Sequence, residues 1–106
     1  MRKISQQAAA ALIAGSTYHN SNTRVEDGVM YLHGNAIASY EPHGMRGVYA
    51  ISLAGWPTVT TKDRLNTLLS ALGASWYLRT IKGQVYAVSR DGRVELDHDG
   101  WYKVKP

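Results

Sequence analysis

The most regular hydrophobic pattern in the chain is a row of four leucines between positions 65 and 72. They fall at i, i+3, i+4 and i+7, which is the spacing of one apolar helix face. Thr60 with Asp63 three residues later is close to a capping box, and Gly73 follows the last leucine as a stop signal. The pattern predicts an amphipathic helix that begins at Thr60 and lays its leucines on a sheet.

Polar residues occupy the rest of this predicted helix. Lys62, Asn66 and Ser70 share the side opposite the leucines, and Arg64 falls near the boundary. We therefore expect the helix to show a polar, basic face to solvent.

An alanine-rich stretch near the start of the chain predicts another helix, over about residues 5–14. Ser5 is placed to cap its N-terminus, and Gly15 suits the left-handed position that ends a helix. Two glutamines interrupt a short apolar run, so we expect this stretch to belong to the mature chain and not to a signal peptide.

Alternating polarity and glycine turns predict strands between the two helices. Asp27-Gly28, a dipeptide typical of tight hairpin turns, separates the first pair of these strands. Further turns at 34–35 and 41–44 continue the meander. The strands are expected at 23–26, 29–32, 36–40 and 48–53.

The same pattern of short strands and glycine turns follows the leucine helix and predicts strands at 76–81, 84–88, 93–96 and 101–104. We expect these four strands to form a second meander. The fold class is therefore predicted as α+β: two short antiparallel meanders packed with an N-terminal helix and one central amphipathic helix.

Composition sets limits on this picture. A chain of 106 residues is expected to form one domain over residues 1–106. It has no cysteine, which excludes disulfides, thiolate zinc sites and a cysteine nucleophile. Neither phosphate-binding glycine motif occurs, and no apolar run approaches the ~18–20 residues that cross a bilayer, so neither a nucleotide cofactor nor a membrane partner is expected.

Positive charge is concentrated in the region from Lys62 to Arg93. The formal net charge is +4, and this region alone holds six lysines and arginines against two aspartates. A local basic surface favours acidic protein partners or polyanions. The residues predicted to bind a partner are Lys62, Arg64, Asn66, Arg79, Lys82 and Arg93.

Aromatic residues beside this charge suggest an alternative, nucleic-acid binding. Strand alternation places Tyr77 and Arg79 on the face opposite Leu78, and Tyr86 falls beside them on the next strand. If that face is open, its rings and basic groups suit stacking on single-stranded nucleic acid. Trp56, in the irregular connector before the leucine helix, is a further possible anchor for a partner.

The densest titratable cluster is Asp97-His98-Asp99, before Gly100. Two carboxylates beside an imidazole suggest, as a remote alternative, a small hydrolase. A hairpin turn explains the same residues, and all four histidines are expected in turns without metal-ligand spacing. We therefore predict no catalytic residue, no metal site and no cofactor.

Several segments resemble small proteins encoded in tailed-bacteriophage genomes. The likeness spans roughly residues 16–104 and is carried by Leu-His-Gly-Asn-x-Ile-Ala at 32–38 and Gly-Trp-x-Thr-x-Thr-Thr-Lys-x-Arg-Leu-Asn at 55–66. The resemblance implies phage origin and expression in the bacterial host cytoplasm. It also implies a role typical of small phage accessory proteins, which bind host enzymes, defence complexes or nucleic acid.

The first hypothesis is therefore a non-enzymatic phage protein that binds a host or anti-phage-defence macromolecule and modulates it. Direct nucleic-acid binding and hydrolysis remain the two alternatives. The sequence does not distinguish a monomer from a dimer.

Overall fold

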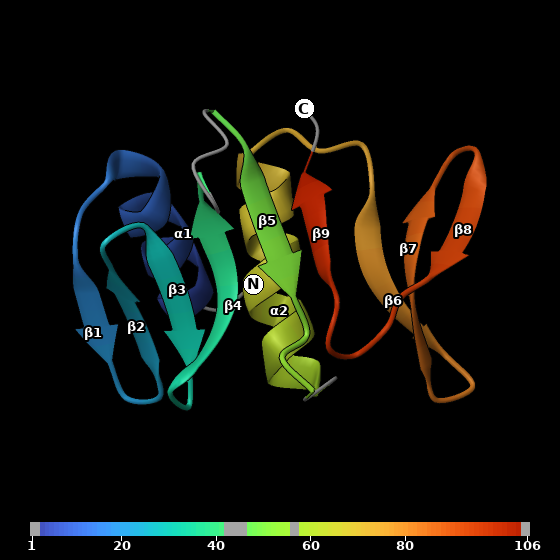
Figure 1. Ribbon diagram of the computed structural model, residues 1–106, viewed down its shortest axis with the longest axis horizontal. Coiled ribbons are helices and arrows are strands. Elements are labelled where there is room, and N and C mark those ends of the chain that lie inside the picture. The colour runs from blue at the N-terminus through green and yellow to red at the C-terminus, as the bar shows by residue number, and fades with distance from the viewer. Residues whose placement is uncertain (1–2, 42–46, 56–57, 105–106) are drawn as a thin grey trace.

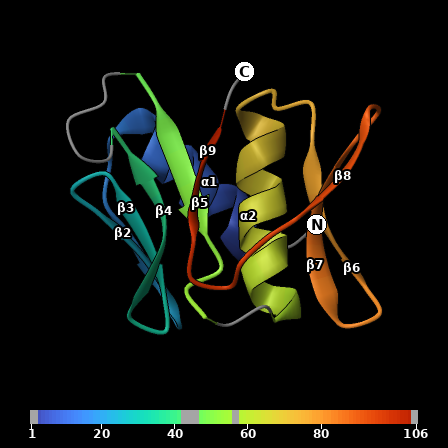
Figure 2. The same cartoon turned by 45° about the vertical axis from the view of Figure 1, so that its right-hand side comes forward.

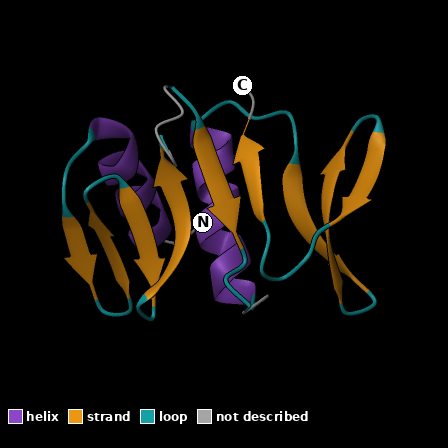
Figure 3. Ribbon diagram, viewed as in Figure 1, coloured by secondary structure: helices purple, strands orange, loops and turns teal. Residues whose placement is uncertain are grey.

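The computed structural model describes residues 3–41, 47–55 and 58–104, which contain two helices and nine strands (Figure 1; coloured by type in Figure 3). The elements are α1 (Lys3–Ala14), β1 (Tyr18–Asn20), β2 (Thr23–Glu26), β3 (Val29–Leu32), β4 (Asn35–Tyr40), β5 (Tyr49–Ser52), α2 (Val59–Ala71), β6 (Tyr77–Ile81), β7 (Gln84–Ser89), β8 (Gly92–Glu95) and β9 (Trp101–Val104).

The strands form two antiparallel sheets. One has six strands in the order β1-β2-β3-β4-β5-β9, and the other has three in the order β6-β7-β8. The helices pack side by side behind the six-stranded sheet, and Figure 2 shows α2 between the two sheets. The predicted α+β class, with an N-terminal helix and a central helix, is confirmed.

The last strand does not continue the second meander, so that part of the prediction is wrong. β9 pairs with β5, with Tyr49 opposite Val104 and Ile51 opposite Tyr102. The backbone N–H of Gly55 donates to the carbonyl of His98 at 2.7 Å, which holds the returning chain against the end of β5. Burial of Val104 in the main core then favours pairing in the larger sheet.

The first hairpin is confirmed. β2 and β3 pair over the predicted residues, and the turn places Asp27 at φ 51° and Gly28 at φ 76°. Two successive positive φ angles define the turn that an Asp-Gly pair favours. β1 was not predicted, because three residues are too few to show an alternating pattern.

Both helices begin before the predicted residue. α1 begins at Lys3, and Ser5 is buried inside it instead of capping it. α2 is capped by Thr58, whose hydroxyl accepts from the N–H of Thr61 at 3.1 Å, so the prediction of a start at Thr60 is wrong. Thr58 and Thr60 both carry the hydroxyl that a helix cap needs, so the residue type alone does not distinguish the two positions.

The main core lies where the helices meet the sheets. Leu65, Leu68 and Leu69 of α2 are at most 1% exposed, as the leucine pattern predicts. Small side chains at Ala8 and Ala9 of α1 are also buried and allow the helix to approach closely. α2 contacts α1 on one side and β6 on another, so it is covered by structure over most of its circumference.

Candidate functional site

The charged residue nearest the middle of α2 lies inside the protein. Arg64 is 3% exposed; its Nε donates to Thr23 Oγ1 at 3.0 Å, and its Nη1 donates to Ser5 Oγ at 2.7 Å. The same Nη1 lies 3.4 Å from Asp63 Oδ2, which also accepts a hydrogen bond from Ser5. The prediction that Arg64 is exposed for partner binding is wrong, because its guanidinium joins α1, β2 and α2.

Asn66 is also used within the fold. Its Nδ2 donates to the carbonyl of Leu78 at 2.9 Å, and its Oδ1 accepts from the N–H of Leu78 at 2.6 Å. At Leu78 the amide therefore takes the place of a neighbouring strand on the outer edge of β6. Lys62, one turn earlier and half-buried, donates to the hydroxyl of Thr80 on the same strand.

These contacts overturn the expected solvent-facing polar side of α2. The second sheet covers part of that side, so Asn66 binds backbone and Lys62 binds a strand hydroxyl. A helical pattern shows which residues share a face but does not show whether another element packs on the polar face. The accessible basic residues from the predicted set are instead Arg79, Lys82 and Arg93, all exposed on the three-stranded sheet or its turns.

One face of the three-stranded sheet is turned away from the core. Leu78 and Val85 are buried on the inner face, as predicted from alternation. The outer residues lie in two cross-strand rows, each with one residue from every strand. We call this outer surface the open sheet face, defined by Tyr77, Val88 and Arg93 in one row and by Arg79, Tyr86 and Glu95 in the other.

Aromatic rings and arginines alternate on the open sheet face. Tyr77 is 47% exposed, and Arg79 beside it is exposed. The Arg93 guanidinium lies 5.0 Å from the centroid of the half-buried Tyr86 ring, within the range of a cation–π contact. The face therefore combines partly exposed aromatic surface with two positive charges and the carboxylate of Glu95.

Lys82 lies at the end of this sheet, in the turn between β6 and β7. It is exposed and takes φ 51°, followed by Gly83 at φ 82°. Lys82 therefore adds an exposed positive charge at the β6–β7 end of the three-stranded sheet. Trp56, the other predicted anchor, lies outside the described residues.

A family model described as Kyanoviridae Gp96 protein matches residues 1–103 of the chain. The chain belongs to this phage protein family. The predicted relation to a phage protein family is thereby confirmed. No curated protein and no solved structure matches the chain. Within the described ranges, neither helix has the length and apolar character needed to cross a membrane.

The acidic turn considered for hydrolysis joins the two sheets and is not a hairpin between adjacent strands. Asp97 and Asp99 are exposed, and His98 is half-buried, with a buried Nε2 that makes no hydrogen bond. In a Ser-His-Asp triad the carboxylate bonds Nδ1 and the nucleophile hydroxyl bonds Nε2, and no described hydroxyl reaches Nε2 of His98. Over the part of the chain that the structure describes, no group of three His, Asp or Glu residues is placed to hold a metal.

The prediction that all four histidines lie in turns is wrong. His33 and His98 do, but His19 belongs to β1, and His43 lies outside the described residues.

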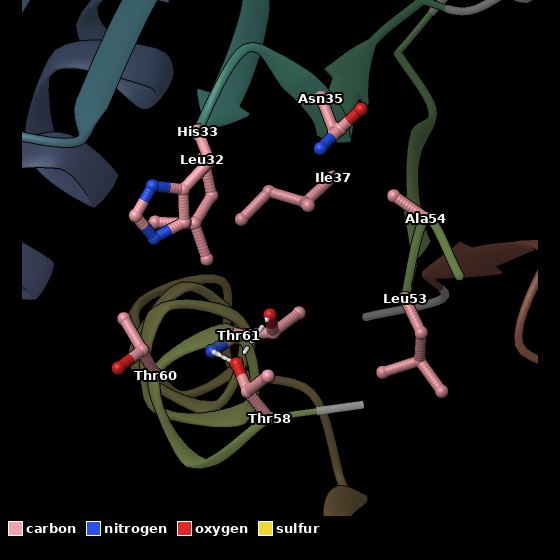
Figure 4. Close-up of a pocket in the computed structure, with 9 residues that line it drawn as sticks. All are labelled: Leu32, His33, Asn35, Ile37, Leu53, Ala54, Thr58, Thr60 and Thr61. Carbon is pink, nitrogen blue, oxygen red and sulfur yellow. Dashed lines mark hydrogen bonds between the residues drawn. The ribbon is translucent and has the colours of Figure 1, made fainter. Parts of the chain in front are cut away.

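A cavity of about 450 Å³ that the sequence did not indicate lies between the start of α2 and the turn after β3 (Figure 4). Leu32, Ile37 and Leu53 give it apolar walls, and threonines of α2 face it. The Thr58 and Thr61 hydroxyls lie 3.0 Å apart and hydrogen-bond each other, so they are engaged in the helix cap. Its apolar walls suit a small apolar group, and the described lining residues include no hydrogen-bonded nucleophile and base.

Proposed function

We propose that this phage protein is a non-enzymatic binding protein that acts in the host cytoplasm on a host or anti-phage-defence macromolecule. It attaches through the open sheet face and modulates its partner by occupying a surface of it. Membership of a phage family supports the setting. The exposed pair of Tyr77 and Arg79, beside Arg93 stacked on Tyr86, is the observation that carries the proposal.

Tyrosine and arginine are the residue types that supply most binding energy in protein interfaces. A tyrosine ring loses little conformational entropy on binding, and an arginine presents five donors to carboxylates. Here both types stand on strands, whose positions are fixed by a hydrogen-bonded sheet. The partner surface that fits is an acidic protein surface with an apolar centre.

The charge pattern favours a protein over nucleic acid. Glu95 lies opposite Tyr86 on the same face and would repel phosphates, but it suits the mixed charges of a protein surface. The guanidinium of Arg93 already lies over the Tyr86 ring and competes with base stacking there. Single-stranded nucleic acid remains a second candidate because Tyr77 is half exposed beside Arg79.

Removing two arginines from the open sheet face tests the proposal. In affinity capture from infected-host lysate, we expect the variant R79A/R93A to bind about tenfold less partner than the wild type, or less still. Interface arginines often contribute above 1 kcal/mol each to binding, and 1.4 kcal/mol corresponds to about a tenfold change in affinity. The measurement is quantitative mass spectrometry of the captured material. Stability should change by only about 0.5 kcal/mol per exposed position.

A matched control lies on the six-stranded sheet. The variant R24A/K103A removes the same charge and also removes an arginine stacked on a tyrosine, since the Arg24 guanidinium lies 4.3 Å from the Tyr31 ring centroid. It should capture as much partner as the wild type. Equal losses in both variants would show that net charge, and not the open sheet face, controls binding.

Salt and nuclease distinguish the two classes of partner. Phosphate binding weakens steeply as the salt concentration rises, because releasing condensed counterions into a more concentrated solution gains less free energy, whereas an interface with an apolar centre weakens much less. Capture that survives nuclease and moderate salt supports the protein partner. If nuclease abolishes the capture, the open sheet face binds nucleic acid instead of a protein.

A further inference from the structure

The two edges of the three-stranded sheet differ in what covers them. The β6 edge packs against α2, and the amide of Asn66 satisfies both backbone groups of Leu78. The β8 edge has no neighbouring strand among the described residues, and all four residues from Gly92 to Glu95 are exposed. Val94 is 64% exposed, and no proline, lysine or bulge protects this strand from pairing.

The backbone groups at this edge are set by the pairing on the other side. Leu96 N–H donates to the carbonyl of Val85 at 3.0 Å, so alternate residues of β8 direct their backbone groups towards β7. Arg93 and Glu95 therefore direct their N–H and C=O groups outward. Their side chains lie on the open sheet face, whereas Val94 lies on the other face.

We propose that β8 pairs antiparallel with β8 of a second copy of this chain, about a two-fold axis at Val94. This register places Arg93 opposite Glu95 of the second copy, and Glu95 opposite its Arg93. The two outward-facing residues of each copy then exchange four backbone hydrogen bonds. Two ion pairs form above the sheet, and the two exposed valines meet on its other face.

The charges of Arg93 and Glu95 favour this register over the two registers next to it. An axis one residue earlier places Arg93 opposite Arg93, and an axis one residue later places Glu95 opposite Glu95. Like charges directly opposite each other destabilise a strand pair. The order Arg-Val-Glu is therefore self-complementary only when the axis passes through Val94.

Self-pairing would join the two small sheets into one of six strands. The axis stands perpendicular to the sheet, so both open sheet faces lie on the same side and form one doubled surface. A four-residue edge buries less than the ~1,000 Å² of a stable interface, so the dimer is expected to be weak and concentration-dependent. The inference rests on the edge of β8 and stands whether or not the proposed partner exists.

Charge reversal tests the pairing. Analytical ultracentrifugation of the full chain should show a mass rising from 11.7 kDa towards twice that value as the concentration increases. R93E and E95R should each remain monomeric, because each places like charges opposite each other in both pairs. The double variant R93E/E95R should dimerise as the wild type does.

Mixing the two single variants is the most specific part of the test. The R93E chain carries two acids on β8 and the E95R chain carries two bases, so an equimolar mixture should form a heterodimer although each chain alone does not self-associate. Unchanged circular dichroism confirms that the single variants are folded. A wild type that stays monomeric at every concentration, a dimer that survives both single reversals, or a mixture that stays monomeric would overturn the proposal.

Discussion

Replacing Arg64 by methionine is expected to lower the free energy of unfolding by about 3 kcal/mol. The guanidinium is buried and donates to Thr23 and Ser5, which lie on two other elements. Its removal leaves these hydroxyls with one partner fewer and takes away a positive charge 3.4 Å from the Asp63 carboxylate. Since the Asp63 side chain is 24% exposed and keeps some water, the loss belongs at the lower end of the range for broken buried pairs.

Urea unfolding followed by circular dichroism measures this loss. The matched control is R79M, the same substitution at an exposed arginine of β6, which should change stability by only about 0.5 kcal/mol. Equal and small losses for R64M and R79M would show that the network around Arg64 contributes little.

Shortening Leu68 to alanine is expected to cost about 2–5 kcal/mol of unfolding free energy. Leu68 is fully buried between α1 and the sheets, in a core that also holds Leu65 and Leu69. The neighbouring side chains are fixed by three packed elements and have little freedom to fill the resulting cavity.

Chemical denaturation of L68A beside V59A checks this estimate. Val59 begins the same helix but is 67% exposed, so its truncation should change stability by no more than about 0.5 kcal/mol. A loss below about 1 kcal/mol for L68A would place the leucine row outside the main core.

Local patterns predicted the parts of the fold that local physics decides. The leucine spacing identified the buried side of α2, and Asp27-Gly28 located the first hairpin. Alternation placed Tyr77 and Arg79 on one face and Leu78 on the other. In each case, neighbours in sequence determine the result.

Contacts between distant segments could not be predicted in this way. Arg64 looked like a surface residue because its partners Ser5 and Thr23 lie 59 and 41 residues away. The same limit applies to β9, whose alternating residues predict a strand but do not specify β5 as its neighbour. Only the arrangement of the whole chain determines which polar groups are buried together.

The candidate site was predicted in part. Arg79, Lys82 and Arg93 were identified from the clustering of charge, and the structure leaves all three exposed. Asn66 was assigned to the same surface, but its amide binds the backbone of Leu78 on β6. That role could not be predicted, because an asparagine on a polar helix face has the same sequence pattern whether it meets water or a strand.

The claim that the open sheet face binds a partner is tested most directly by covalent labelling of tyrosines in the free and captured protein. Tyr77, 47% exposed, should be labelled in the free chain and protected in the complex. Tyr40, 39% exposed on the six-stranded sheet, is the internal control and should be labelled equally in both. Protection of Tyr40 with unchanged labelling of Tyr77 would contradict the claim and place the partner on the larger sheet.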